Sequence, residues 1–233
     1  FFSYISGRLI VQYEGRRKIQ KAVSGTNIIL NLSILGVFKY YNFFAENFAV
    51  LFRNIGWQVD WVTLDILLPV GISFYTFQAL SYSIDVYQKK LPVCKDIIAF
   101  FAYISFFPQL VAGPIERATN LLPQFYKSRT FDYAQAVDGC RQMLWGFFKK
   151  IVVADNCAEA ANVIWGDYSN QSGFTLLLGG FFFTFQIYGD FSGYSDIAIG
   201  TARLFGINLM RNFNFPYFSR DIAEFWRRWH ISL

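Results

Sequence analysis

The chain has 233 residues, of which 54% are hydrophobic and only 16% are charged, whereas soluble domains carry about 25% charged residues. Phenylalanine, tyrosine and tryptophan together make up 21% of the sequence, which is more apolar surface than one soluble core can bury. Composition therefore excludes an ordinary soluble domain and predicts an integral membrane protein. The net charge of +5 does not indicate nucleic-acid binding, because the basic residues gather at the edges of apolar segments, where the positive-inside rule expects them.

Four long apolar segments follow one another along the chain, at residues 28–52, 66–84, 97–115 and 168–189. Each is close to the ~20 residues that a helix needs to cross a hydrocarbon core about 30 Å thick. The first segment is less clean than the others because it contains Lys39 and Glu46. The sequence therefore predicts an all-α fold, built as a polytopic transmembrane helical bundle.

Helix-breaking residues interrupt two of these segments. Pro69 and Gly71 lie in the second, and "FFPQLVAGPIER" places further breakers near the end of the third. A proline inside a helix removes a backbone hydrogen bond, and in lipid the freed groups must be satisfied by protein or by water that fills a cavity. The breaks therefore indicate either a cavity wall or plain kinks packed against neighbouring helices. The candidate substrate-binding residues in the third segment are Pro108, Gln109, Gly113 and Pro114.

No linker, repeat or low-complexity tract divides the sequence, so we expect a single membrane-embedded domain over residues 1–233. Between residues 133 and 165, charged residues punctuate an apolar pattern at helical intervals. This pattern fits helices at the membrane interface and equally helices that cross deep inside a bundle. Cys94, Cys140 and Cys157 lack the pair spacing of metal or redox sites, so we expect no metal.

The stretch "YGDFSGYSDIAIGTARLFG", residues 188–206, begins where the last uncharged segment ends. Ionisable residues near membrane depth are costly and usually face a cavity or a partner, while Gly189 and Gly193 have the spacing that lets helices approach closely. The stretch is therefore either a helix–helix contact with interfacial aspartates or a polar wall of a substrate chamber. Its candidate substrate-binding residues are Tyr188, Asp190, Ser192, Tyr194, Ser195 and Asp196.

The stretch "NFNFPYFSRDIAEFWRRWHISL", residues 212–233, predicts one more helix. Ser219 or Asp221 can cap a helix that begins near Ile222. Glu224 in its first turn interacts favourably with the positive end of the helix dipole and forms a favourable i,i+4 pair with Arg228.

His230 is the only histidine of the chain. At about 100° per residue, it lies at the edge of an apolar arc with Trp226 and Trp229, opposite the charged side chains. Desolvation beside aromatic rings favours the neutral imidazole, which can accept a proton as a general base. From the residues alone, a histidine that only packs against tryptophans is the more common case.

Four motifs, in order, resemble the membrane-bound O-acyltransferase family and within it the bacterial alginate O-acetylation proteins. They are "LLPVGISFYTFQALSYSIDVY", "YISFFPQLVAGPIERATNLLPQF", "DFSGYSDIAIG" and "NFNFPYFSRDIAEFWRRWHISL". The resemblance implies a bundle of transmembrane, re-entrant and broken helices around a central tunnel. It also implies that His230, in the W-H-x-S context of the family, is an active-site residue at membrane depth.

The resemblance also implies a second invariant histidine, the usual general base, tens of residues beyond Leu233. His230 would then be the upstream member of the pair, which orients or polarises rather than deprotonates. We therefore expect this chain to be an internal piece truncated at both ends and inactive by itself.

The expected reaction moves an acetyl group from a cytoplasmic thioester, acetyl-CoA or an acyl carrier protein, toward hydroxyls of an extracytoplasmic polysaccharide such as alginate. Trp226 and Trp229 would exclude water from the thioester. No cofactor is expected besides this co-substrate. The other expected partners are the polysaccharide or a periplasmic acetyltransferase and the lipids of the bacterial inner membrane.

Two alternatives stay open at this point. Within the family, the acyl group can instead be D-alanine for teichoic acid, or acetyl for peptidoglycan. Outside catalysis, broken helices and intramembrane aspartates are also features of transporters, so the protein can be a scaffold that passes an acyl group to a periplasmic transferase.

Overall fold

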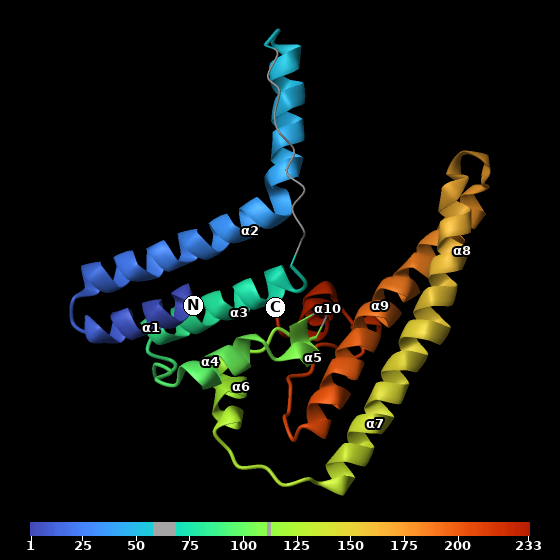
Figure 1. Ribbon diagram of the computed structural model, residues 1–233. Helices are drawn as coiled ribbons and strands as arrows, with labels where there is room; N and C mark the ends of the chain where they lie inside the picture. Colours follow the sequence, from blue (N-terminus) through green and yellow to red (C-terminus); the bar gives the residue numbers. More distant parts are fainter. Residues whose placement is uncertain (58–68, 111–112) are drawn as a thin grey trace. The chain divides into compact units, whose positions relative to one another are not determined.

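The computed structural model describes residues 1–57, 69–110 and 113–233, and in this part of the chain the regular structure is helical, with no strands (Figure 1). The all-α prediction is therefore confirmed. The helices gather into two compact units, the first formed by residues 1–105 with 117–122 and the second by residues 106–116 with 123–233. The prediction of a single domain stays a prediction.

Small polar side chains hold the helices of the first unit together. Ser3 donates to Asn27 across 3.1 Å, and the hydroxyls of Ser6 and Ser83 lie 3.4 Å apart. Such short side chains let helices approach closely in membrane proteins. The helices of this unit are α1 (Phe2–Gln12), α2 (Arg17–Asn54), α3 (Ile72–Tyr87) and α4 (Ile97–Ile104), and α6 (Ala118–Phe125) begins in it.

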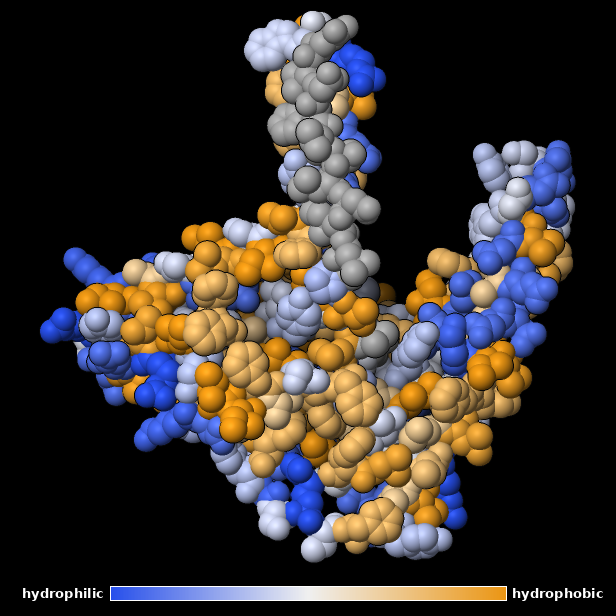
Figure 2. Space-filling model, in the orientation of Figure 1, coloured by the Kyte–Doolittle hydropathy of each residue, from blue (hydrophilic) through white to orange (hydrophobic). Residues whose placement is uncertain are grey.

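The predicted spans 28–52 and 168–189 lie largely within α2 and α9 (Gly173–Leu204). Both helices are long and apolar enough to cross a membrane, and apolar side chains cover large areas of the visible face of both units (Figure 2). Outward-facing apolar helices of this length fit a surrounding of lipid rather than water.

The other two predicted spans are broken at their prolines. Residues 66–68 lie outside the described part, and α3 begins only after Pro69, with Gly71 in the left-handed region at a φ of 76°. The expectation that the third span crosses as one helix is wrong. Here α4 ends at Ile104 and α5 (Phe107–Leu110) is a separate short turn, because Pro108 cannot donate a helical hydrogen bond to the turn before it.

The second unit is built on two long antiparallel helical segments. One consists of α7 (Tyr133–Phe147), the π-helical segment η1 (Phe148–Ala154) and α8 (Asp155–Gly166), and α9 runs beside all three (Figure 1). Side-chain caps begin both segments, with Asp132 accepting from Gln135 N and Ser172 from Thr175 N. Short turns η2 (Tyr168–Asn170) and η3 (Pro216–Phe218) flank α9, and α10 (Ile222–Arg228) follows.

Reciprocal glycine contacts let α7 and α9 meet at backbone distance. A Cβ at Gly200 would lie 2.4 Å from the carbonyl oxygen of Gly139, and one at Gly146 would lie 2.7 Å from that of Gly193. The predicted close approach at Gly189 and Gly193 is confirmed, since a Cβ at Gly189 would lie 3.1 Å from the backbone oxygen of Lys149. This contact brings the polar residues of α9 against the polar face of α7.

Candidate functional site

The helix predicted near Ile222 is confirmed as α10, with Asp221 as its cap. The Asp221 carboxylate accepts a hydrogen bond from Glu224 N at 2.7 Å, whereas the alternative cap, Ser219, donates its hydroxyl to Pro216 O. The helix ends at Arg228, so the expectation that His230 continues its apolar arc is wrong.

The chain reverses after α10. Trp229 is extended and His230 has a φ of 48°, in the left-handed region. Two backbone bonds fix the reversal: Ile231 N–H donates to Asn212 O and Asn214 N–H donates to Arg228 O, both at 2.9 Å. The imidazole is thus held by a turn and by the 212–214 segment, not by a helix.

Glu224, in the first turn of α10, ties the start of this helix to its last residue, Arg228. Its carboxylate accepts from Arg220 N at 3.0 Å and Arg220 Nε at 3.1 Å, and it also pairs with Arg228. The backbone bond from Arg220, followed by the side-chain bonds, lowers the pKa of Glu224 from its usual 4.5 to about 2.

A depressed pKa means that Glu224 stabilises α10 fully above pH 4.5 and loses this effect as the pH falls toward 2. We therefore expect amide hydrogen exchange of residues 221–229, corrected for the intrinsic pH dependence, to be faster at pH 3 than at pH 7. In Glu224→Gln the protection would already be low at pH 7 and would change little. Equal protection in both proteins at both pH values would contradict this role.

The His230 ring lies half-buried between an aromatic ring and an amide. Phe191 of α9 meets it edge to face, with ring centroids 4.8 Å apart at 87°, and Nδ1 lies 3.1 Å from Asn212 Oδ1. Burial lowers the pKa of His230 below its usual value, because desolvation penalises the charged form. The neutral imidazole expected from the sequence is therefore the favoured form.

Asn212 is the centre of the hydrogen bonds around this histidine. Its Oδ1 accepts from Ser232 N at 3.3 Å and from Ser232 Oγ at 2.9 Å, and its Nδ2 donates to Ser195 Oγ at 3.2 Å. Asn212 and Ser195 are both almost completely buried. The network therefore connects the His230 turn directly to α9.

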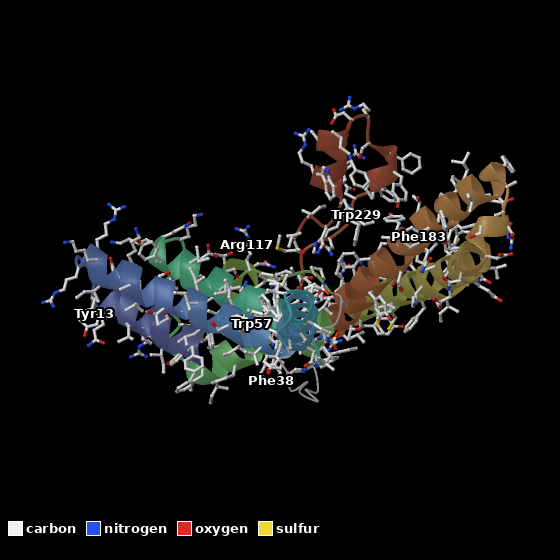
Figure 3. The ribbon with its side chains drawn as sticks, turned by 90° about the horizontal axis from the view of Figure 1, so that it is seen from above. Tyr13, Phe38, Trp57, Arg117, Phe183 and Trp229 are labelled. Atoms are coloured by element: carbon white, nitrogen blue, oxygen red, sulfur yellow. The ribbon has the colours of Figure 1, made fainter. Side chains whose placement is uncertain are left out.

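Aromatic rings surround the network on the side of α10. Trp229 packs on Tyr188 at 6.2 Å, on Phe213 at 5.1 Å and on Phe225 at 5.5 Å between ring centroids, and Figure 3 shows it on the side of α10 that faces α9. Trp226 is instead 63% exposed. Of the two tryptophans expected at the site, Trp229 packs into this aromatic wall, whereas Trp226 meets its outer ring, Phe225, edge to face at 5.3 Å.

A cavity of about 370 Å³ opens between α7, α9 and the 211–215 segment, in the size range of small-molecule sites. Asp196 lines it, paired with Lys149 and accepting from Gln142 Nε2 at 3.0 Å. His230 is not among its described lining residues, and Asn212 stands between the two. The lining residues are Gln142, Trp145, Lys149, Tyr188, Ser192, Ser195, Asp196, Ile199, Arg211, Asn212, Phe213 and Phe215.

The structure thus divides the polar residues expected on α9. Tyr188, Ser192, Ser195 and Asp196 line the cavity. Asp190 and Tyr194 are not part of its described lining, and they surround Lys150, whose ammonium lies 2.9 Å from the Asp190 carboxylate and 5.7 Å from the centre of the Tyr194 ring. Asp190 and Tyr194 therefore belong to a helix–helix contact, and the other four residues form a cavity wall. That this cavity is a substrate chamber stays a prediction.

The proline-rich segment contacts the same helix at another place. A Cβ at Gly113 would lie 3.1 Å from the Cβ of Ala198, and Ile115 N–H donates to Ser232 Oγ at 2.9 Å. Gln109 and Pro114 are buried and Pro108 half-buried, and none of these residues is among the described lining of the cavity. The segment supports the His230 turn through Ser232.

Sequence reasoning missed several residues of the site, above all Asn212, Gln142 and Lys149. The charged pair Lys149–Lys150 inside an apolar stretch was a signal, since buried charges need partners. Asn212 gave no signal of its own, because nothing in "NFNF" shows that the chain folds back onto it.

Known proteins resemble this chain over the helices and the turn that form the site. The family model of the membrane-bound O-acyltransferases matches residues 93–233. The chain is 43% identical over 206 residues to the probable alginate O-acetylase AlgI of Pseudomonas aeruginosa and 36% identical over 232 residues to the peptidoglycan O-acetyltransferase of Helicobacter pylori. It is 29% identical over 168 residues to the teichoic acid D-alanyltransferase of Bacillus subtilis.

These alignments cover 88%, 88% and 70% of the chain but only 39%, 43% and 42% of the three relatives. The chain therefore spans about two fifths of the length of the curated relatives that it matches. The family match extends over more than half of the chain and includes α7, α9 and the His230 turn. The chain belongs to the membrane-bound O-acyltransferase family.

Proposed function

We propose that the full-length protein is a membrane O-acyltransferase that moves an acetyl group from a thioester donor to hydroxyls of an extracytoplasmic polysaccharide. The observation that carries the proposal is the His230 imidazole, held 3.1 Å from buried Asn212, which itself lines the cavity. Family membership and the names of the relatives support the reaction class. The catalytic role of His230 is part of the proposal.

The reaction requires little chemistry from the protein. A neutral imidazole accepts the proton of the attacking hydroxyl, whose oxygen forms a bond to the thioester carbonyl carbon. The tetrahedral intermediate then breaks its C–S bond, and the leaving thiolate takes the proton back from the imidazolium. If a further histidine of the whole protein acts as the base, His230 orients the reactants instead.

We propose that the site lies in the inner membrane, in a bundle of broken and complete helices around a tunnel. Support comes from the two apolar helices α2 and α9 and from the breaks at Pro69 and Pro108, since irregular backbone at membrane depth requires a protein or water lining. Acetyl-CoA would enter from the cytoplasm and the acceptor from the other side. The aromatic wall that includes Trp229 would keep water from the thioester.

The decisive experiment offers the purified full-length protein, in lipid nanodiscs, three donor–acceptor pairs: acetyl-CoA with alginate, acetyl-CoA with peptidoglycan fragments, and D-alanyl carrier protein with teichoic acid. We expect acetyl esters on alginate, because the chain is more similar to the alginate O-acetylase than to the peptidoglycan or teichoic acid enzyme. Transfer from the D-alanyl carrier alone, or acetylation of peptidoglycan alone, would overturn the acceptor. Absence of transfer and of acetyl-CoA turnover would favour a scaffold for a separate transferase.

A further inference from the structure

We propose that Asn212 is a positioning residue that holds His230 in the Nδ1–H tautomer, so that the unprotonated Nε2 is the nitrogen offered to the reaction. This inference rests on the proposed function and deepens it by assigning the reacting atom of His230. It is carried by the geometry of four hydrogen-bond contacts at one amide group.

The orientation of the Asn212 amide follows from its partners. Ser232 N–H, at 3.3 Å, is a backbone group that can only donate, so the amide atom that faces it must be the oxygen. The amide nitrogen then faces Ser195 Oγ at 3.2 Å, which can accept. A flipped amide would set N–H against N–H at Ser232, so only one orientation satisfies both sides.

The tautomer of His230 follows from the amide orientation. Nδ1 lies 3.1 Å from an oxygen that has no proton to give. If Nδ1 were also bare, two acceptors would face each other at hydrogen-bond distance in a half-buried place, which costs free energy. Nδ1 therefore carries the proton, and in the neutral ring this leaves Nε2 with the free lone pair.

The amide itself is fixed from three directions. The backbone carbonyl of Asn212 accepts from Ile231 N at 2.9 Å, its side chain bonds to Ser195 on α9, and Ser232 is in turn bonded by Ile115 N. Asn212 is only 1% exposed, so its side chain is shielded from water and held in one rotamer by these bonds. A rigid acceptor of this kind holds the ring direction as well as the proton, as a second partner does for metal-bound histidines.

The charged groups on the described elements around the imidazole bond to groups other than His230. On α9, Asp190 and Asp196 pair with Lys150 and Lys149. On the element of His230, Glu224 pairs with Arg220 and Arg228. On the 211–214 segment, Arg211 bonds to Asn214 Oδ1 at 3.3 Å.

The test compares kcat and KM across pH for the full-length wild type, Asn212→Asp, Asn212→Leu and the control Asn214→Asp. A carboxylate at 212 keeps the acceptor and stabilises the imidazolium, so the acidic limb of kcat/KM should move up by about one pH unit or more. Asn212→Leu should lower kcat about 10- to 100-fold, as loss of an orienting partner does at metal-bound histidines.

Asn214→Asp is the matched control, because it adds the same charge two residues away on an exposed side chain that bonds to Arg211 rather than to His230. It should leave the pH profile in place. An unmoved profile in Asn212→Asp, with kcat retained in Asn212→Leu, would overturn the positioning role. If His230→Ala itself keeps full activity, the proposed function of the histidine fails instead, so the two failures are distinguishable.

A measurement on the wild-type protein tests the tautomer of His230 even where the variants fail to fold. The ¹⁵N spectrum of histidine-labelled full-length protein, minus that of His230→Gln, gives the signal of His230 alone. Protonated Nδ1 with bare Nε2 is the expected pattern. The opposite tautomer, with Nε2 protonated, would overturn the proposal whatever the variants do.

Discussion

Replacing His230 with alanine in the full-length protein is expected to lower acyl transfer by about 10²- to 10⁴-fold, the usual contribution of a positioned acid–base group. Donor binding should change little, because the imidazole is not among the described residues that line the cavity. The ring packs on Phe191 alone among the described aromatic contacts, so the loss should be kinetic rather than structural. Ester-linked acetate on the exported polymer, normalised to the amount of membrane protein, measures it.

His230→Asn separates a proton-accepting role from an orienting one. Asparagine is among the residues that tolerate the left-handed region, which fits the φ of 48° at this position, and its amide can still donate to Asn212 Oδ1. It has no equivalent of Nε2 as a base. We expect it to be as impaired as alanine; recovery of activity would assign His230 an orienting role, and undiminished activity of both variants would reject any role in the reaction.

Gly200→Ala is expected to destabilise the second unit by about 1–3 kcal/mol, the usual cost of overpacking a tight contact. The new methyl group would lie 2.4 Å from the carbonyl oxygen of Gly139 and 2.9 Å from the backbone nitrogen of Met143. Neither atom is the end of a flexible side chain, so α7 and α9 must separate. Since Gln142 and Asp196 bond across this contact, the cavity should open and activity should fall with stability.

Gly180→Ala is the matched control on the same helix. A Cβ there meets no atom within 4 Å, and alanine is a better helix former than glycine by up to about 1 kcal/mol. Thermal unfolding of the full-length protein in detergent should therefore show a lower midpoint for Gly200→Ala and an equal or higher one for Gly180→Ala. Equal midpoints for the two variants would contradict the backbone contact.

Capping and long apolar runs were readable in the sequence because each depends on residues close together in the chain. A helix that begins near Ile222, the pair of Glu224 with Arg228 and the apolar span 168–189 that lies largely within α9 all depend on such neighbours. The end of α10 was not readable. Trp229 and His230 continue the helical pattern, but backbone bonds to Asn212 and Asn214 replace the helical ones, and these partners lie more than a dozen residues away.

The sequence by itself determined the all-helical class, the apolar helices that can cross a membrane and, through its motifs, the family. Composition and short-range pattern suffice for these features, because lipid and helix geometry act on each segment separately. Only the tertiary structure decided which polar residues form the site. It gave Asp190 and Asp196 different lysine partners, left Trp226 exposed and brought Asn212 to His230. The reason is that the close glycine contacts of α9 and the chain reversal after α10 bring together residues that are far apart in the sequence.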